Sequence, residues 1–181
     1  MLLQLTTVLI SLLVIPLSRP ASAASASEIN TEVRETLARF TREIGGASAY
    51  IQAARGVLVF PTVYKAGIGI GAEYGEGALL VGGQPVDYYS TMAASFGFQL
   101  GAQAKSIVIL FMQDEALRKF RESEGWKVGV DGSIAIVDMG LGKELSSQTL
   151  QNPIVGFVFG QKGLMYNLTL EGSKFTRLNK N

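Results

Sequence analysis

The sequence predicts an α+β protein built on a strongly curved, mainly antiparallel, glycine-rich β-sheet, rolled toward a barrel. An N-terminal helical segment and one short inserted helix complete this fold. Two observations carry the prediction. Strand-like segments follow one another in a nearly unbroken series after residue 56, rather than alternating with helices. Several of these segments also contain glycine at alternate positions, which is typical of a sheet that bends sharply.

One stretch of the chain has glycine on a single strand face. Side chains alternate between the two faces of a strand, so residues of the same parity lie together. One parity here is Gly67, Gly69, Gly71, Gly75 and Gly77; the other is Ala66, Ile68, Ile70, Ala72 and Tyr74. A face without side chains indicates that a backbone, a helix or a ligand lies close against it.

A second segment repeats this design. Its apolar face is Met92, Ala94, Phe96, Phe98 and Leu100, and its smoother face is Ala93, Ser95, Gly97, Gln99 and Gly101.

The N-terminus has the features of a secretory signal. Residues 1–17 contain no charged side chain, and Ala21-Ser22-Ala23 is a small-x-small site of the kind that signal peptidase cuts. The n-region lacks Lys and Arg, so an uncleaved anchor is the alternative, although the apolar run is short for a membrane span. We expect a signal peptide over residues 1–23, a single domain over residues 24–181, and export to the periplasm, cell envelope or exterior.

The domain divides into a helical part over residues 24–56 and a β-rich part over residues 57–181. Ser25 and Glu28 have capping-box spacing, and an apolar stripe at helical intervals follows until Gly45-Gly46. A shorter helix is expected over residues 47–54. The stripe consists of Ile29, Val33, Leu37, Phe40 and Ile44.

The β-rich part begins with a short strand over residues 57–60, which we expect to stop at Pro61. The run 107–112 is apolar throughout, as in a strand covered on both faces. Asp114 is expected to cap a helix that reaches Glu122, and Asp131-Gly132 to form a hairpin turn. Residues 154–159 and 164–170 are expected to form a last pair of strands.

Composition excludes several kinds of chemistry. The chain has no Cys and no His, so disulfides, Cys-His dyads, Ser-His-Asp triads and nearly all zinc sites are ruled out. Arg19 is the only charged side chain in residues 1–23, so the rest of the chain is neutral and lacks the basic footprint of nucleic-acid binding. No acidic pair stands out by its spacing. We therefore expect no enzyme activity, no cofactor and no metal.

Gly67-x-Gly69-x-x-Ala72 matches a dinucleotide-binding fingerprint in its letters alone. That motif requires a strand, a turn and a helix, whereas these glycines lie within a strand pattern. Aromatic and basic residues near the turns, among them Tyr64, Lys65, Trp126 and Lys127, are instead compatible with a membrane interface. The alternative is that the aromatic residues belong to the core and the lysines to the solvated surface.

The chain resembles the SYLF domain family, also described as lipid-binding or yeast-actin-regulator related. The resemblance runs from about residue 28 to 177. Within the family, the chain is similar to the stand-alone, exported bacterial type. It rests on residues 54–61 (ARGVLVFP), 65–71 (KAGIGIG), 97–103 (GFQLGAQ), 163–164 (GL) and 168–174 (LTLEGSK).

The resemblance implies a non-catalytic module that binds lipid. Eukaryotic relatives bind phosphoinositide membranes, and some bundle actin; an exported protein is not expected to meet actin. The expected partner is an anionic phospholipid or membrane surface. The alternative is a protein-interaction or structural module, in which the glycine face seats the N-terminal helix and the partner is an envelope protein. Basic residues in or beside the matched motifs are expected to contact phosphate headgroups: Arg55, Lys65, Lys162 and Lys174.

Overall fold

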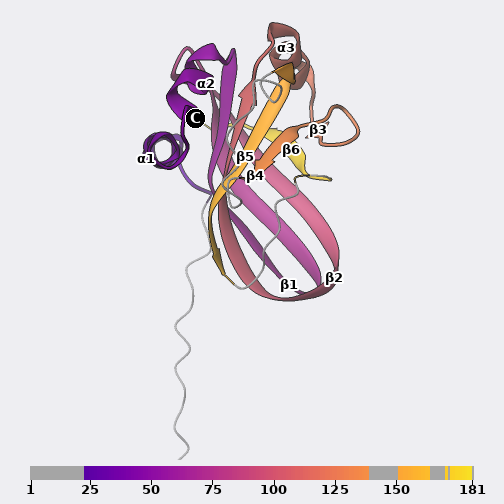
Figure 1. The fold of residues 1–181 in the computed structure, drawn as a ribbon. Helices are drawn as coiled ribbons and strands as arrows, with labels where there is room; N and C mark the ends of the chain where they lie inside the picture. The colour runs from indigo at the N-terminus through magenta and orange to yellow at the C-terminus, as the bar shows by residue number, and fades with distance from the viewer. Residues whose placement is uncertain (1–22, 139–150, 164–169, 171, 181) are drawn as a thin grey trace, which may run out of the picture.

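The computed structural model describes the backbone at residues 23–138, 151–163, 170 and 172–180, and the side chains there apart from those of residues 95–100, 138 and 163. The expected signal segment, the 140–152 loop and the last strand over residues 164–170 lie wholly or mostly outside this part. Within it the fold is α+β, with a mainly antiparallel sheet that curls on itself, as the sequence predicts (Figure 1).

Two helices open the described chain. Helix α1 (Ala26–Glu43) begins at Ser25, whose hydroxyl and backbone form the predicted capping box with Glu28. Helix α2 (Ala47–Ala53) begins at Gly46, which has a φ of 78°. The buried side of α1 carries Ile29, Val33 and Phe40, so the apolar stripe packs onto the sheet.

The centre of the fold is one very long β-hairpin. Strand β1 (Gly56–Val81) pairs antiparallel with β2 (Gln84–Phe111) along nearly its whole length, from Gly56 opposite Phe111 to Val81 opposite Gln84. The connecting turn is Gly82-Gly83, and both residues have positive φ, which glycine adopts without strain.

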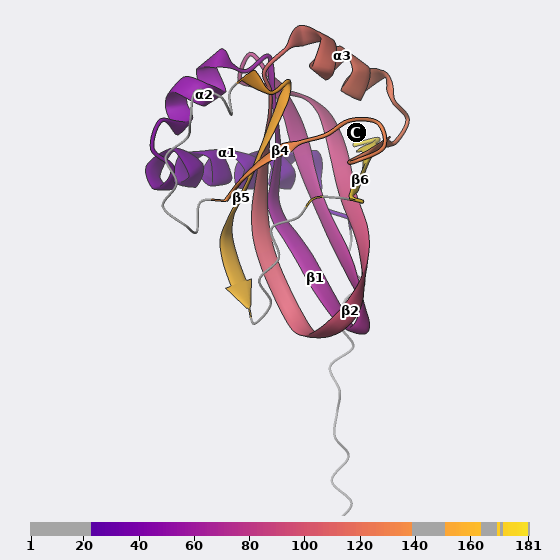
Figure 2. The ribbon, with the colours of Figure 1, turned by 45° about the vertical axis from the view of Figure 1, so that its right-hand side comes forward.

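The hairpin folds back on itself at its middle. Gly69 has a φ of 72°, and the register with β2 shifts between Ile68 and Ile70. Figures 1 and 2 both show the resulting bend at the end of the molecule opposite α3. We call this turn of both strands the bend; it divides β1 into a first half (56–68) and a second half (70–81).

The two halves of β1 then pack backbone against backbone. A Cβ at Gly75 would lie 2.7 Å from the carbonyl oxygen of Thr62, and a Cβ at Gly77 would overlap the carbonyl oxygen of Val59. The glycine face therefore seats the strand's own first half, one of the three occupants that its pattern allows, and not the N-terminal helix.

The remaining strands extend the hairpin on both sides of the bend. Strand β5 (Ile154–Gly163) pairs antiparallel with the later part of β2, and β4 (Ala135–Asp138) pairs parallel with β5. Strand β6 (Lys174–Leu178) pairs with the early part of β2, and β3 (Trp126–Lys127) pairs with β6. The inserted helix is α3 (Asp114–Glu122).

The sheet separates two hydrophobic cores. Residues 107–111 contribute to both, because Ile107, Ile109 and Phe111 face inward while Val108 and Leu110 face α1 and α2. This confirms that the apolar run is covered on both faces. The inner core also contains Leu58, Phe60, Leu79, Tyr89, Phe120, Trp126 and Phe175, and the outer core Ile29, Val33, Phe40, Val57, Val59, Phe157 and Phe159.

Three local expectations were wrong, and the first two concern Pro61 and Asp114. The first strand does not stop at Pro61, because the ladder absorbs this residue in a bulge between Phe60 and Val63. Gln113, not Asp114, is the N-cap residue of α3, and Asp114 pairs instead with Arg55.

Asp131-Gly132 is a turn, but it does not join two paired strands. The Asp131 carboxylate accepts a hydrogen bond from the backbone N–H of Lys127, and an isolated bridge joins Val128 and Gly132. Strand β4 pairs with β5 instead.

Gly77→Ala should destabilise the fold strongly, because the new methyl group would collide with the Val59 backbone, which cannot move aside as a side chain can. We expect a loss of about 1–3 kcal/mol or more in the free energy of unfolding, measured by urea denaturation. Gly45→Ala is the matched control, since its Cβ would meet nothing within 4 Å. Equal stability of the two variants would contradict the close packing of the β1 halves.

Candidate functional site

The outer surface at the bend is apolar and exposed to solvent. Ile68 and Ile70 are 82% and 64% exposed, and the tyrosines at the two ends of this stretch, Tyr64 and Tyr74, are 65% and 46% exposed. We call the exposed residues of this surface the bend face: Tyr64, Ala66, Ile68, Ile70, Ala72, Tyr74, Met92, Ala94 and Ala102.

The bend face inverts the usual distribution of side chains. The glycine parity of β1 points inward and the apolar parity points toward water, although a sheet ordinarily buries its apolar face. From Tyr64 to Tyr74 the exposed positions of β1 carry no charge. Contiguous exposed apolar surface of this kind, with polar residues at its rim, marks a site of interaction with a protein or a membrane.

Lysines flank the bend face on both sides. On one side the strand register places Tyr64, Ala104 and Lys162 in a row across β1, β2 and β5. On the other side, Tyr74 and Met92 are in register with two exposed lysines, Lys174 on β6 and Lys127 on β3. Residues directly opposite one another share a sheet face, so each row leads from an aromatic residue to a cation.

Behind the bend face, the interior holds a buried ion cluster. The Glu73 carboxylate lies 3.4 Å from Nζ of Lys65 and 2.8 Å from Nζ of Lys105. Lys65 and Lys105 are 2% exposed and Glu73 is 8% exposed. Lys65 and Glu73 come from the two halves of β1 and Lys105 from β2, so the cluster ties the halves together across the bend.

Among the described residues, this cluster has one more basic than acidic side chain. Two ammonium groups share one carboxylate, and the Lys105 contact lacks hydrogen-bond geometry. Beside it, the Gln103 amide donates to Gln161, while its own oxygen has no partner among the described residues. Because buried charges are weakly screened by salt, the excess charge adds a positive potential behind the bend face.

A second polar junction lies at Glu76, where the two ends of the domain meet the hairpin. Its carboxylate accepts hydrogen bonds from Lys180 at 2.7 Å and from the Tyr74 hydroxyl at 2.7 Å. Burial opposes ionisation of Glu76, but these bonds and one from the Ala24 backbone hold its pKa below 4.5. Burial and the bond to Glu76 raise the pKa of Tyr74 to about 12.

The four basic residues predicted from the sequence do not form one site. Arg55 lies at the start of β1, far from the bend, and pairs with Asp114 at 3.5 Å. Lys65 lies inside the fold. Lys162 and Lys174 are exposed on strands at opposite sides of the bend face. The sequence marked Lys127 as compatible with a membrane interface but did not place it among these four residues, and the register now places it beside Lys174. The bend face as an exposed surface was not predicted.

A groove of about 500 Å³ lies beside the bend face, lined in part by Glu32, Tyr64, Tyr74 and Glu76. Its two carboxylates disfavour an anionic ligand there. No group of three or more carboxylates that could hold a metal ion occurs among the described residues. None of the described helices is long and apolar enough to cross a membrane.

Residues 92–181 match the family model of Ysc84, described as a Las17-binding protein actin regulator. No curated protein matches the chain. The family match confirms the resemblance found in the sequence: the chain belongs to the SYLF family. Membership associates the chain with lipid and membrane binding or with actin regulation in general.

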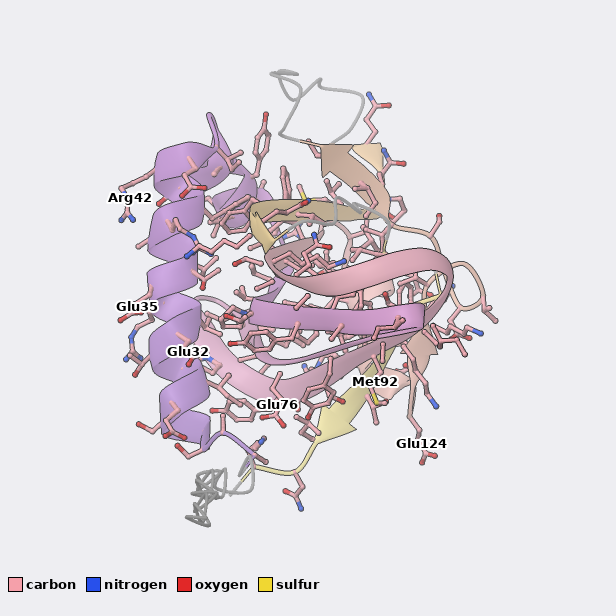
Figure 3. All side chains as sticks on the ribbon, turned by 90° about the horizontal axis from the view of Figure 1, so that it is seen from below. Glu32, Glu35, Arg42, Glu76, Met92 and Glu124 are labelled. Atoms are coloured by element: carbon pink, nitrogen blue, oxygen red, sulfur yellow. The ribbon has the colours of Figure 1, made fainter. Side chains whose placement is uncertain are left out.

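Glu73→Gln should destabilise the fold, because it leaves two buried ammonium groups without a carboxylate. Breaking a buried ion pair by removing one partner costs about 3–5 kcal/mol. Urea unfolding would measure this loss, and Glu124→Gln, at an exposed position labelled in Figure 3, serves as the control. A loss for Glu73→Gln no larger than that of the control would show that the cluster does not hold the bend.

Acid should weaken the junction at Glu76. A carboxyl group whose pKa is lowered by folding stabilises the protein above its unfolded pKa, and this stabilisation disappears as the pH falls through the folded value. The melting temperature of the wild type should therefore fall more steeply below about pH 4.5 than that of Glu76→Gln. Parallel pH profiles of the two proteins would contradict the role of Glu76.

Proposed function

We propose that this protein is a non-catalytic module of the SYLF type that binds the surface of anionic phospholipid membranes. One observation carries the proposal: an exposed apolar face on the hairpin is flanked on both sides by exposed lysines, Lys162 on one and Lys174 with Lys127 on the other. Each cation near an anionic membrane surface contributes about 1 kcal/mol of binding energy.

Lys162 and Lys174 make the main contacts with the phosphate headgroups. Lys127 joins Lys174, because these residues are opposite each other on paired strands. Lys65 acts from inside, as part of the buried cluster whose excess charge lies behind the bend face. Direct contact of Lys65 with a phosphate would require the hairpin to open. Arg55 would form a separate contact at the far end of β1.

Export is part of the proposal. The support for it is the uncharged N-terminal run and the small-x-small site that ends at Ala23. Cleavage there would make Ala24 the first residue of the mature chain, and the Ala24 backbone already bonds to Glu76. The ammonium group so formed would lie next to a carboxylate, a favourable pairing.

The family resemblance also supports binding rather than catalysis, and the absence of His and Cys removes the commonest general bases and thiol nucleophiles. The exposed apolar face keeps a second candidate open, an envelope protein as partner, because such a face also suits a protein interface. Salt-dependent binding to lipid alone, without added protein, separates the two candidates.

The test is flotation of purified residues 24–181 with vesicles, either anionic or zwitterionic, at low and high salt. We expect binding to anionic vesicles that weakens with salt. Lys162→Glu/Lys174→Glu should weaken it more than tenfold, because two headgroup contacts become repulsive. Arg42→Glu/Lys119→Glu makes the same change in net charge on helices α1 and α3 and is the control. No flotation by the wild type, or equal losses in both double variants, would refute the proposal.

A further inference from the structure

We propose that the bend face penetrates the headgroup layer of the membrane and places Ile68 and Ile70 among the acyl chains. This inference deepens the proposed function and rests on it. The occupant of the bend face is therefore a phospholipid leaflet, and the hairpin, not the N-terminal helix, is the element that inserts.

The position of the bend suits insertion. It forms one extreme end of the molecule, with the helices gathered toward the other end (Figures 1 and 2). Ile68 is the most exposed of the large hydrophobic residues described. Tyr64 lies four positions before Ile68, and Tyr74 lies four positions after Ile70, so each tyrosine lies roughly 13 Å along its strand from the tip. Tyrosine favours the headgroup level, with its ring between lipid and water.

Charge complementarity identifies the partner as an anionic leaflet. Tyr64 and Tyr74 are in register with the rows that end in Lys162 and Lys174, so the lysines lie at the level where phosphates would be. Long lysine side chains reach from an apolar surface toward such a layer. Among the described residues of β1 from 64 to 76, the acidic ones are Glu73, which is buried between two lysines, and Glu76, which is paired with Lys180.

The paired backbone on either side of the bend can enter a poorly hydrated layer at low cost. Unpaired N–H and C=O groups are what exclude most irregular structure from lipid. Here Gly67 pairs with Gly101, Ile68 with Leu100 and Ile70 with Phe96, so the strand ladder continues on both sides of Gly69. On β1 the break in the ladder is Gly69 alone, and on β2 it is residues 97–99, which are not paired with β1.

The N-terminal helix is a poorer candidate for insertion. Its apolar side chains are already buried in the outer core, where Phe40 packs on Phe157 at a ring distance of 4.9 Å. The residues labelled along it in Figure 3 are Glu32, Glu35 and Arg42, a mixed surface with acidic character. Inserting α1 would expose the outer core, whereas inserting the bend disturbs no core residue.

The first experiment uses the flotation assay with Ile68→Ser/Ile70→Ser. Both positions are exposed, so we expect the thermal stability of this variant to be unchanged. It keeps Lys162 and Lys174, yet its binding to anionic vesicles should be at least tenfold weaker. Val86→Ser is the control. It removes an exposed apolar side chain just after the Gly82-Gly83 turn, which lies beside α2 and away from the bend.

The second experiment measures depth directly. The chain has no cysteine, so Ile68→Cys provides a single site for an environment-sensitive fluorophore. On anionic vesicles its emission should shift to the blue, and lipids brominated on their acyl chains should quench it. The same label at Val86→Cys should show neither effect.

Outcomes separate this inference from the proposed function. Flotation with an unshifted label at residue 68, and wild-type binding by Ile68→Ser/Ile70→Ser, would overturn insertion and leave headgroup binding standing. No flotation at all would overturn both. A blue shift that depends on protein concentration and is unaffected by vesicles would show that a second copy covers the bend face, and would likewise overturn insertion.

Discussion

The close approach of β1 to itself is the constraint on which the rest of the structure depends. Gly75 and Gly77 let the second half of the strand lie directly on the backbone of the first, near Thr62 and Val59. Because the halves cannot be separated by side chains, the hairpin must turn sharply between them, and Gly69 supplies that turn. The direction of the β1 side chains near the bend follows from this packing.

One result of that packing is a polar interior behind an apolar exterior. Lys65, Glu73 and Lys105 point into the narrow space between the halves, where they form ion pairs. Ile68 and Ile70 lie on the opposite face of the strand and therefore point toward solvent. A buried ion pair is weak evidence of stability in itself, because desolvation offsets attraction. Its contribution here is to fix the shape of the surface on which the proposed lipid contact depends.

The sequence predicts much of this fold and less of the site. Period-two glycines at 67–77 predicted a strand face pressed against another element, and the first helix follows from its cap and stripe. Which face meets water was not predictable, because it depends on the fold-back between residues distant in sequence. Lys65 illustrates the limit: the bulge after Phe60 changes the phase of the strand, so the residue expected at a headgroup lies inside.

The tight turn at Gly82-Gly83 has a consequence for the order of folding. Pairs near this turn close short loops and cost little chain entropy, whereas Gly56 and Phe111 join across the whole hairpin. Zippering should therefore start at the turn and proceed toward the strand ends, with contacts of β5 and β6 forming later. Such a topology, rich in contacts between distant residues, belongs to the slower-folding class of small proteins.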